Sequence, residues 1–140
     1  MNIVVTIKQV EDPITPPAYL VLDASGKRAV SASGTPLVMN GYDANALEEA
    51  LRLKERHGGK ITAICVADDS GRKTLKRAVA MGADSAILLS DPLWQTLDSC
   101  GIACVLAAAV RKIGQVDLVF CGRQASDSDN GQVYTGWPSC

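Results

Sequence analysis

The chain has 140 residues, of which 47% are hydrophobic, 21% are charged and 4% are aromatic. Fifteen acidic residues balance fourteen basic ones, so no positive surplus is present to neutralise a nucleic-acid backbone. The composition excludes wholesale disorder, because enough apolar residues are present to form a core, and the length fits one domain over residues 1–140.

Signals for export, membrane insertion and disulfide bonding are weak. The N-terminus lacks the basic flank and the apolar stretch of a secretory signal. The longest apolar run, residues 102–110, is far shorter than the ~20 residues that a membrane span needs. The cysteines are odd in number and lie in apolar runs, which suits reduced thiols better than a disulfide framework; they are Cys65, Cys100, Cys104, Cys121 and Cys140. We therefore expect a cytoplasmic protein without membrane insertion.

The first forty residues divide into a strand and an irregular segment. Branched apolar residues predict a strand over residues 2–10, buried on both faces at the centre of a parallel sheet. Four prolines then exclude a helix over residues 11–39, where two short apolar runs flank a turn at residues 23–26. We predict an irregular excursion that carries a small hairpin, and loops of this length are more often functional than idle.

From residue 40 onward, helices and strands alternate. The patterns predict helices over residues 40–57, 70–81 and 98–113, and strands over residues 61–66, 86–89 and 117–121. Asn40 is a good N-cap for the first helix, and Asp43 is placed to return the capping hydrogen bond. Alternation with short loops predicts an α/β fold, a doubly wound parallel sheet with helices on both faces.

Ligands of doubly wound sheets bind beyond the carboxyl ends of the strands, where the strand order reverses. Here that rule selects the segments after Val5, after Val66 and after Cys121. The last of these, residues 122–133, contains two glycines, two serines and an asparagine. Its backbone N–H groups could therefore hold a phosphate, with Arg123 as a positive partner.

Two interpretations remain open for these polar segments. Asp127 and Asp129 repel phosphate, and the glycine spacing matches neither the Walker loop nor the Gly-x-Gly-x-x-Gly fingerprint, so the last loop could simply cap a following helix. The N-terminus of the helix at residues 40–57 suits an anion, but on local chemistry alone plain capping is the favoured explanation of Asn40.

Catalytic and metal chemistry find little support. Cys100 and Cys104 have the spacing of metal ligands on a helix, but no second pair of ligands completes a zinc site. His57 is the only histidine, so neither a Ser-His-Asp nor a Cys-His arrangement is supported. We therefore predict a protein with no catalytic residues and no metal.

Four segments of the chain carry a family resemblance. They are IVVTIKQV at residues 3–10, NGYDANALEEALRLKE at 40–55, AVAMGAD at 78–84 and CGRQASDSDNGQV at 121–133. In order and spacing they resemble the beta subunit of electron transfer flavoproteins, and together they span nearly the whole chain. The sequence departs from that pattern at Gly41, where a proline commonly follows the asparagine, and at Ser128 and Asn130 in the last loop.

The resemblance implies a fold of the adenine nucleotide alpha-hydrolase-like type, related to the universal stress proteins. It implies an electron carrier subunit without catalytic residues of its own, in a heterodimer with an alpha subunit with which it shares FAD. The other implied partners are dehydrogenases such as acyl-CoA dehydrogenases, whose electrons pass on to an acceptor. The cleft of the beta subunit is expected to hold AMP, or FAD in electron-bifurcating members.

The resemblance also assigns residues to the nucleotide. They are Thr6, Asn40, Gly41, Tyr42, Asp43, Val66, Gly122, Arg123, Gln124, Ala125, Ser126, Asp127, Asp129, Asn130, Gly131, Gln132 and Val133. We expect Thr6 and Val66 to enclose adenine, and backbone N–H groups of the last loop to hold the phosphate. For Asp127 and Asp129 we expect loop-shaping or ribose contacts.

Members of this family continue past the point where this sequence stops, at Cys140. We therefore expect the front portion of a longer subunit, with a sheet that lacks its last strand and leaves residues 117–121 at an edge. The alternative is a stand-alone universal-stress-like protein that binds ATP or AMP. A nucleotide-hydrolysing enzyme is disfavoured, because the Walker-type lysine is missing.

Overall fold

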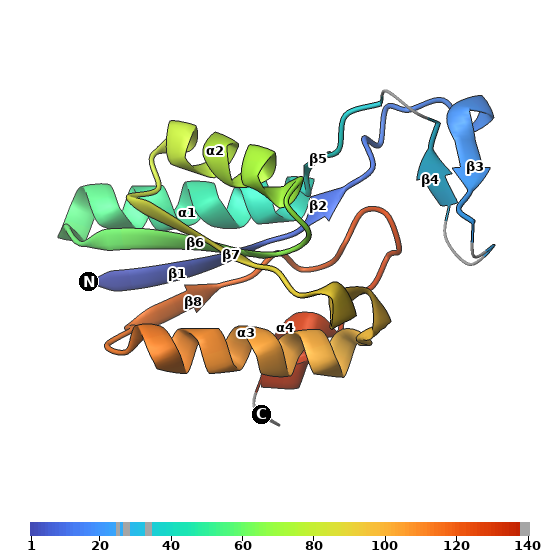
Figure 1. Ribbon diagram of the computed structural model, residues 1–140. Coiled ribbons are helices and arrows are strands. Elements are labelled where there is room, and N and C mark those ends of the chain that lie inside the picture. Colours follow the sequence, from blue (N-terminus) through green and yellow to red (C-terminus); the bar gives the residue numbers. More distant parts are fainter. Residues whose placement is uncertain (25, 27–28, 33–34, 138–140) are drawn as a thin grey trace.

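A parallel sheet of four strands forms the centre of the computed structural model, which describes residues 1–24, 26, 29–32 and 35–137 (Figure 1). In spatial order its strands are β7 (Ser85–Leu89), β6 (Lys60–Val66), β1 (Asn2–Ile7) and β8 (Leu118–Phe120). Every pairing between them is parallel. The predicted α/β fold with a parallel sheet is confirmed, and β1 lies in the interior of the sheet, as expected.

Helices cover both faces of this sheet. In Figure 1 α1 (Gly41–His57) and α2 (Gly71–Met81) lie on one face, and α3 (Ser99–Ile113) and the short α4 (Val133–Gly136) lie on the other. Two 3-10 turns, η1 (Pro17–Tyr19) and η2 (Pro92–Thr96), occur in the connections. The three long helices begin one residue later than predicted, because the residue before each start is the flanking cap position.

Alternate residues of β1 enter two separate cores, which explains its run of branched apolar residues. Ile3 and Val5 belong to the core under α1 and α2. Val4 packs with Ile64 and Leu106 in the core under α3. Because β1 is buried on both faces, its sequence shows a continuous apolar run instead of an alternating pattern.

The strand predicted over residues 2–10 is in fact two strands. After β1 the chain leaves the main sheet at Lys8, and β2 (Gln9–Val10) pairs antiparallel with β5 (Val38–Met39). Within the segment predicted as an irregular excursion, β3 (Leu20–Leu22) and β4 (Ala29–Ser31) form an antiparallel hairpin. Residues 25, 27 and 28 of its turn lie outside the described residues.

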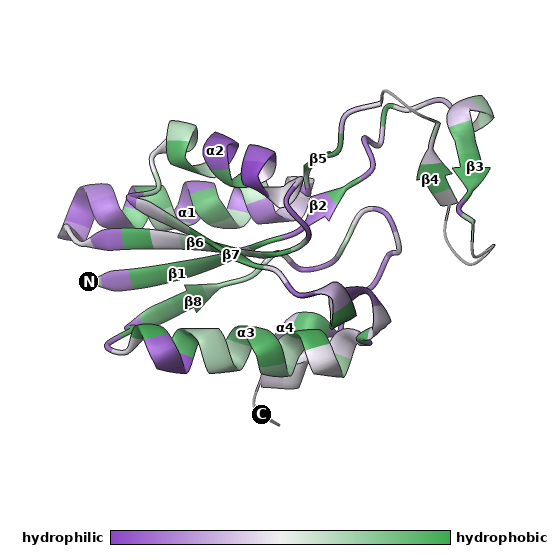
Figure 2. Ribbon diagram, in the orientation of Figure 1, coloured by the Kyte–Doolittle hydropathy of each residue, from purple (hydrophilic) through white to green (hydrophobic). Residues whose placement is uncertain are grey.

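The β3–β4 hairpin projects away from the sheet (Figure 1), and Figure 2 shows that β3 is hydrophobic. All three residues of β3 are exposed, and Leu22 keeps 69% of its surface in contact with solvent. The hairpin therefore carries apolar side chains without a core of its own.

Three of the four cysteines in the described part of the chain are free: Cys65, Cys100 and Cys121. Cys104 is disulfide-bonded, so the expectation of reduced thiols is wrong for that residue, and Cys140 lies outside the described residues. Within the described ranges, no group of three or more His, Cys, Asp or Glu residues is placed to hold a metal ion. A search of the same ranges for a helix that is long and apolar enough to cross a membrane finds none.

Gly59 is required where the chain turns from α1 into β6. Its φ is 123°, and a Cβ atom there would lie 1.9 Å from the carbonyl oxygen of Met1, which accepts a hydrogen bond from Lys60. We expect Gly59→Ala to lower the free energy of unfolding by about 1–3 kcal/mol, measured by urea denaturation. The control is Gly58→Ala, which has φ 68° and open space around the added Cβ and should cost less; equal losses would exclude the contact with Met1 as the cause.

Candidate functional site

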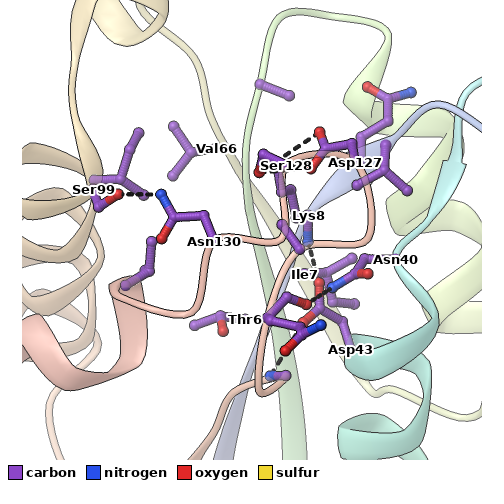
Figure 3. A pocket seen from close by; sticks show the side chains of 18 of the residues that line it. Thr6, Ile7, Lys8, Asn40, Asp43, Val66, Ser99, Asp127, Ser128 and Asn130 are labelled. Carbon is purple, nitrogen blue, oxygen red and sulfur yellow. Dashed lines mark hydrogen bonds and ion pairs between the residues drawn. The ribbon is translucent and has the colours of Figure 1, made fainter.

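A cavity of about 690 Å³ opens at the carboxyl ends of β1, β6 and β8 (Figure 3). The chain runs from β1 to β6 and β7 on one side of β1, and then crosses to β8 on the other side. The strand order therefore reverses between β1 and β8, which is the position where doubly wound sheets bind their ligands.

Most of the residues assigned to the site from sequence line this cavity. They are Thr6, Asn40, Asp43, Val66, Gly122, Arg123, Gln124, Ala125, Asp127, Asn130, Gly131 and Val133. The cavity lining does not include Gly41, Tyr42, Ser126, Asp129 and Gln132. The residues of the second group lie in the same turns as the first, and all five are exposed.

Asn40 occupies the N-cap position of α1, as predicted, but its side chain has a different role from the predicted one. Its side chain makes no capping hydrogen bond and is instead 1% exposed between α1 and the loop after β8. The Asn40 Nδ2 group donates to the carbonyl oxygen of Gln124 at 2.8 Å, and its Oδ1 atom accepts from the Ser126 N–H at 3.2 Å. The amide side chain therefore joins two elements that are more than eighty residues apart in sequence.

Asp43 also lacks the capping role that its spacing indicates. Its carboxylate accepts hydrogen bonds from the backbone N–H of Lys8, at 2.7 Å, and of Gly122, at 3.1 Å. Burial raises the pKa of Asp43 to about 6, although hydrogen bonds from Lys8, Asn40 and Gly122 act in the opposite direction. The group is therefore a carboxylate at neutral pH, held at the junction of α1 with the ends of β1 and β8.

Lys8 is a site residue that the sequence interpretation missed. Its Nζ atom lies 2.6 Å and 2.8 Å from the two carboxylate oxygens of Asp127. With 44% and 26% of the two side chains exposed, this ion pair contributes little to stability. Lys8 could have been identified from the sequence, because it directly follows a central strand and the segment after that strand was expected to lie at the ligand site.

The loop after β8 is fixed by its own polar side chains. The Ala125 N–H donates to the carbonyl oxygen of Asn130 at 2.9 Å, and Gln124 Nε2 donates to Asp129 Oδ1 at 2.5 Å. Asn130 Nδ2 donates to Ser99 Oγ at 2.6 Å (Figure 3), which ties the loop to the start of α3. The loop therefore has a defined shape between α1 and α3.

One wall of the cavity was not predicted at all. It is formed by η2 and the first turns of α3, with Trp94, Leu97 and Ile102 among its residues. The sequence pattern assigned the apolar stripe of α3 to the core and left residues 92–97 without an element. Ile102 lies against the core under α3 and lines the cavity at the same time, so periodicity could not separate the two roles.

A parallel α/β sheet with a cavity at its switch point defines a class of ligand-binding domains. The family model of the electron transfer flavoprotein domain matches residues 28–135. The chain is 43% identical over 133 residues to the electron transfer flavoprotein subunit beta of Thermoanaerobacterium thermosaccharolyticum, covering 95% of this chain and 49% of the relative. It is 39% identical over 140 residues to the protein FixA of Azorhizobium caulinodans, covering 97% and 48%. The chain belongs to the electron transfer flavoprotein domain family, as its resemblance indicated.

The chain spans about half the length of the curated relatives it matches. Another relative, from Anaerotignum propionicum, is named acryloyl-CoA reductase electron transfer subunit gamma and is 35% identical over 141 residues, covering 95% of this chain and 49% of the relative. The names of the relatives from Thermoanaerobacterium thermosaccharolyticum and Anaerotignum propionicum describe them as electron transfer subunits.

Proposed function

We propose that this chain is the nucleotide-holding part of an electron transfer flavoprotein beta subunit. In this role it binds an adenine nucleotide, AMP or FAD, in the cavity at the switch point and pairs with an alpha subunit that carries FAD. The observation that carries the proposal is the position of the cavity between β1 and β8, lined by loops from both strands. Family membership supports the electron transfer role.

The lining fits a nucleotide held by backbone groups. Five carboxylates and two cations line the cavity; they are Glu11, Asp43, Asp68, Asp98 and Asp127, with Lys8 and Arg123. Phosphate binding would therefore depend on N–H dipoles, and within the described ranges the N–H groups of Ser128 and Gly131 make no hydrogen bond to protein. A Cβ atom at Gly131 would lie 3.2 Å from the carbonyl oxygen of Arg123, so a side chain at this position would require the turn to shift by a few tenths of an ångström.

The remaining parts of the nucleotide would meet different walls. Thr6 and Val66 at the ends of β1 and β6 would lie against adenine, as the family resemblance implies. Lys8 would contact a phosphate oxygen in place of Asp127, because its partly exposed ion pair can be exchanged at small cost. The redox chemistry is supplied by the FAD of the alpha subunit, which would take electrons from dehydrogenases such as acyl-CoA dehydrogenases. Beta-subunit names among the relatives support that pairing.

Titration of the purified chain with AMP in a calorimeter tests this proposal. Adenosine measures the contribution of the phosphate, inosine monophosphate measures that of the adenine edge, and FAD tests the larger ligand. Gly131→Val is expected to weaken AMP binding about tenfold or more, because the added side chain crowds the loop around Arg123. The control is Ala108→Val on the exposed side of α3.

Absence of AMP and FAD binding by the wild-type chain would refute the nucleotide part of the proposal. Equal AMP affinity in Gly131→Val and wild type would refute the binding of phosphate by the loop around Gly131, but not nucleotide binding in the cavity. Co-expression with an electron transfer flavoprotein alpha subunit tests the pairing, since a complex should copurify with the flavin colour of its FAD.

A further inference from the structure

Three elements meet at the carboxylate of Asp43. The side chain is 5% exposed and belongs to the first turn of α1, whereas its two hydrogen-bond donors, the Lys8 and Gly122 amides, follow β1 and β8. These are the two strands between which the strand order reverses. A single carboxylate therefore bridges the point where the cavity opens.

Gly122 lets the end of β8 come this close to α1. A Cβ atom at residue 122 would lie 2.0 Å from Asp43 Oδ1 and 2.9 Å from the Asp43 backbone nitrogen. No side chain other than that of glycine fits this approach without a shift. The close contact therefore depends on both residues: a carboxylate at position 43 and a glycine at position 122.

The segment 122–126 is attached to α1 through side chains at the helix start. In the part of the chain that the structure describes, its hydrogen bonds to that helix start involve Asn40, Tyr42 and Asp43. Gln124 Nε2 reaches the Tyr42 hydroxyl only at 3.4 Å. Asn40 holds Gln124 and Ser126 by two neutral hydrogen bonds, whereas Asp43 holds Gly122 through a charged acceptor.

The charged surroundings of Asp43 are simple. Lys8, at the end of β1, supplies the positive charge that faces it. The thiols of Cys65 on β6 and Cys121 after β8 are the other titratable groups that interact with it, and burial raises the pKa of both, that of Cys65 to about 12. Both thiols stay neutral over the range in which Asp43 changes its charge.

We propose that Asp43 is the positioning residue of the cavity: as a carboxylate it holds the start of segment 122–126 against α1, and its protonation or replacement by Asn partly releases that segment, which Asn40 still holds at Gln124 and Ser126. A carboxylate offers an acceptor oxygen to each of the two N–H groups. An amide keeps one acceptor and turns a donor toward the other N–H, so one of the two hydrogen bonds is lost; a neutral acid keeps only the weaker acceptor capacity of its hydroxyl oxygen there, so that hydrogen bond is weakened. The consequence for nucleotide affinity rests on the proposed function, whereas the release of the segment does not.

Asp43→Asn tests this inference, and Asp117→Asn is its matched control. Asp117 Oδ2 accepts from the Asn2 N–H at 2.6 Å, so it makes the same kind of bond between β1 and β8 at the other end of both strands. Amide hydrogen exchange at Gly122 and Lys8, followed by NMR at pH 7.5, should be about tenfold faster in Asp43→Asn and unchanged in Asp117→Asn. In the wild-type chain the same two amides should lose protection as the pH falls from 7.5 to 5, after correction for the intrinsic exchange rate.

AMP affinity gives the second measurement. Asp43→Asn should bind AMP about fivefold to tenfold more weakly than wild type at pH 7.5. The AMP affinity of the variant should also vary less with pH between 5 and 7.5 than that of wild type, because residue 43 no longer titrates. The phosphate of AMP titrates equally in both proteins, so it cancels in the comparison.

The outcomes separate this inference from the proposed function. Unchanged exchange at Gly122 and Lys8 in Asp43→Asn overturns the inference, whether or not AMP binds. Faster exchange supports it, and AMP binding by wild type then decides the proposed function separately. If Asp43→Asn fails to fold, the pH dependence of exchange in wild type decides the inference instead: constant protection between pH 7.5 and 5 overturns it.

Discussion

Replacing Gly122 by Ala is expected to open the cavity and to weaken AMP binding at least about thirtyfold. The added Cβ would lie 2.0 Å from Asp43 Oδ1, 2.9 Å from the Asp43 nitrogen and 3.0 Å from the carbonyl carbon of Tyr42. Two of these three atoms belong to the helix backbone and cannot turn aside, so the end of β8 must move away from α1. We also expect a loss of about 1–3 kcal/mol in the free energy of unfolding. Calorimetry with AMP and urea denaturation measure the two effects.

A double-mutant cycle shows whether the carboxylate is the group that Gly122 accommodates. In the Asp43→Ala background the shortest contact is gone, so Gly122→Ala should cost less there than in wild type. Equal costs in the two backgrounds would show that the clash with the helix backbone dominates. They would also remove the reason for treating residues 43 and 122 as one unit.

The layered fold could be predicted because it depends on local patterns. β1 reads as a buried strand since its neighbours cover both faces, and α3 shows its apolar stripe because that stripe packs on the sheet. The break at Lys8 could not be predicted, because the partners of β2 in β5 lie 28 and 30 positions later in the sequence, after the excursion. Pairing at that distance leaves no trace in the alternation of residues 9–10.

The cavity could be located, but the roles of its residues could not be assigned. The rule of strand ends selects the right segments whatever their sequence. Asn40 and Asp43, by contrast, have the spacing of a helix cap, and the side-chain oxygen atoms that would cap the helix instead accept from the N–H groups of Ser126, Lys8 and Gly122. Whether such a side chain caps the helix or binds a distant segment depends on residues far away in the sequence. Gly122, for example, follows Asp43 by 79 positions. Local chemistry alone cannot decide between them.

These corrected roles change the expected energetics of the site. A cap stabilises its helix, so its removal lowers stability. A buried carboxylate whose pKa is raised to about 6 by burial costs stability whenever it is charged. The presence of a carboxylate at residue 43 is therefore better explained by its role in positioning segment 122–126 than by a contribution to the stability of α1.

Asp43→Asn should consequently be more stable than wild type at neutral pH, by up to about 3 kcal/mol. In the unfolded chain the carboxyl titrates near 3.8, whereas in the folded chain it titrates at about 6. Between these values the folded state binds more protons than the unfolded state, so the contribution of Asp43 to stability is present below pH 4 and is lost as the pH rises through 6. The variant lacks this loss, because an amide does not titrate.

Urea denaturation of both proteins at a series of pH values between 4 and 7.5 measures this difference. The two free energies of unfolding should lie closest at pH 4 and diverge by pH 7.5 in favour of the variant. Asp68 and Asp84, whose pKa values are lowered by their hydrogen bonds, act with the opposite sign but equally in both proteins. A variant that is less stable than wild type at pH 7.5 would contradict the prediction and would make Asp43 a structural residue. A variant that is more stable yet binds AMP more weakly has the combination expected when a buried charge is kept for the geometry of a site.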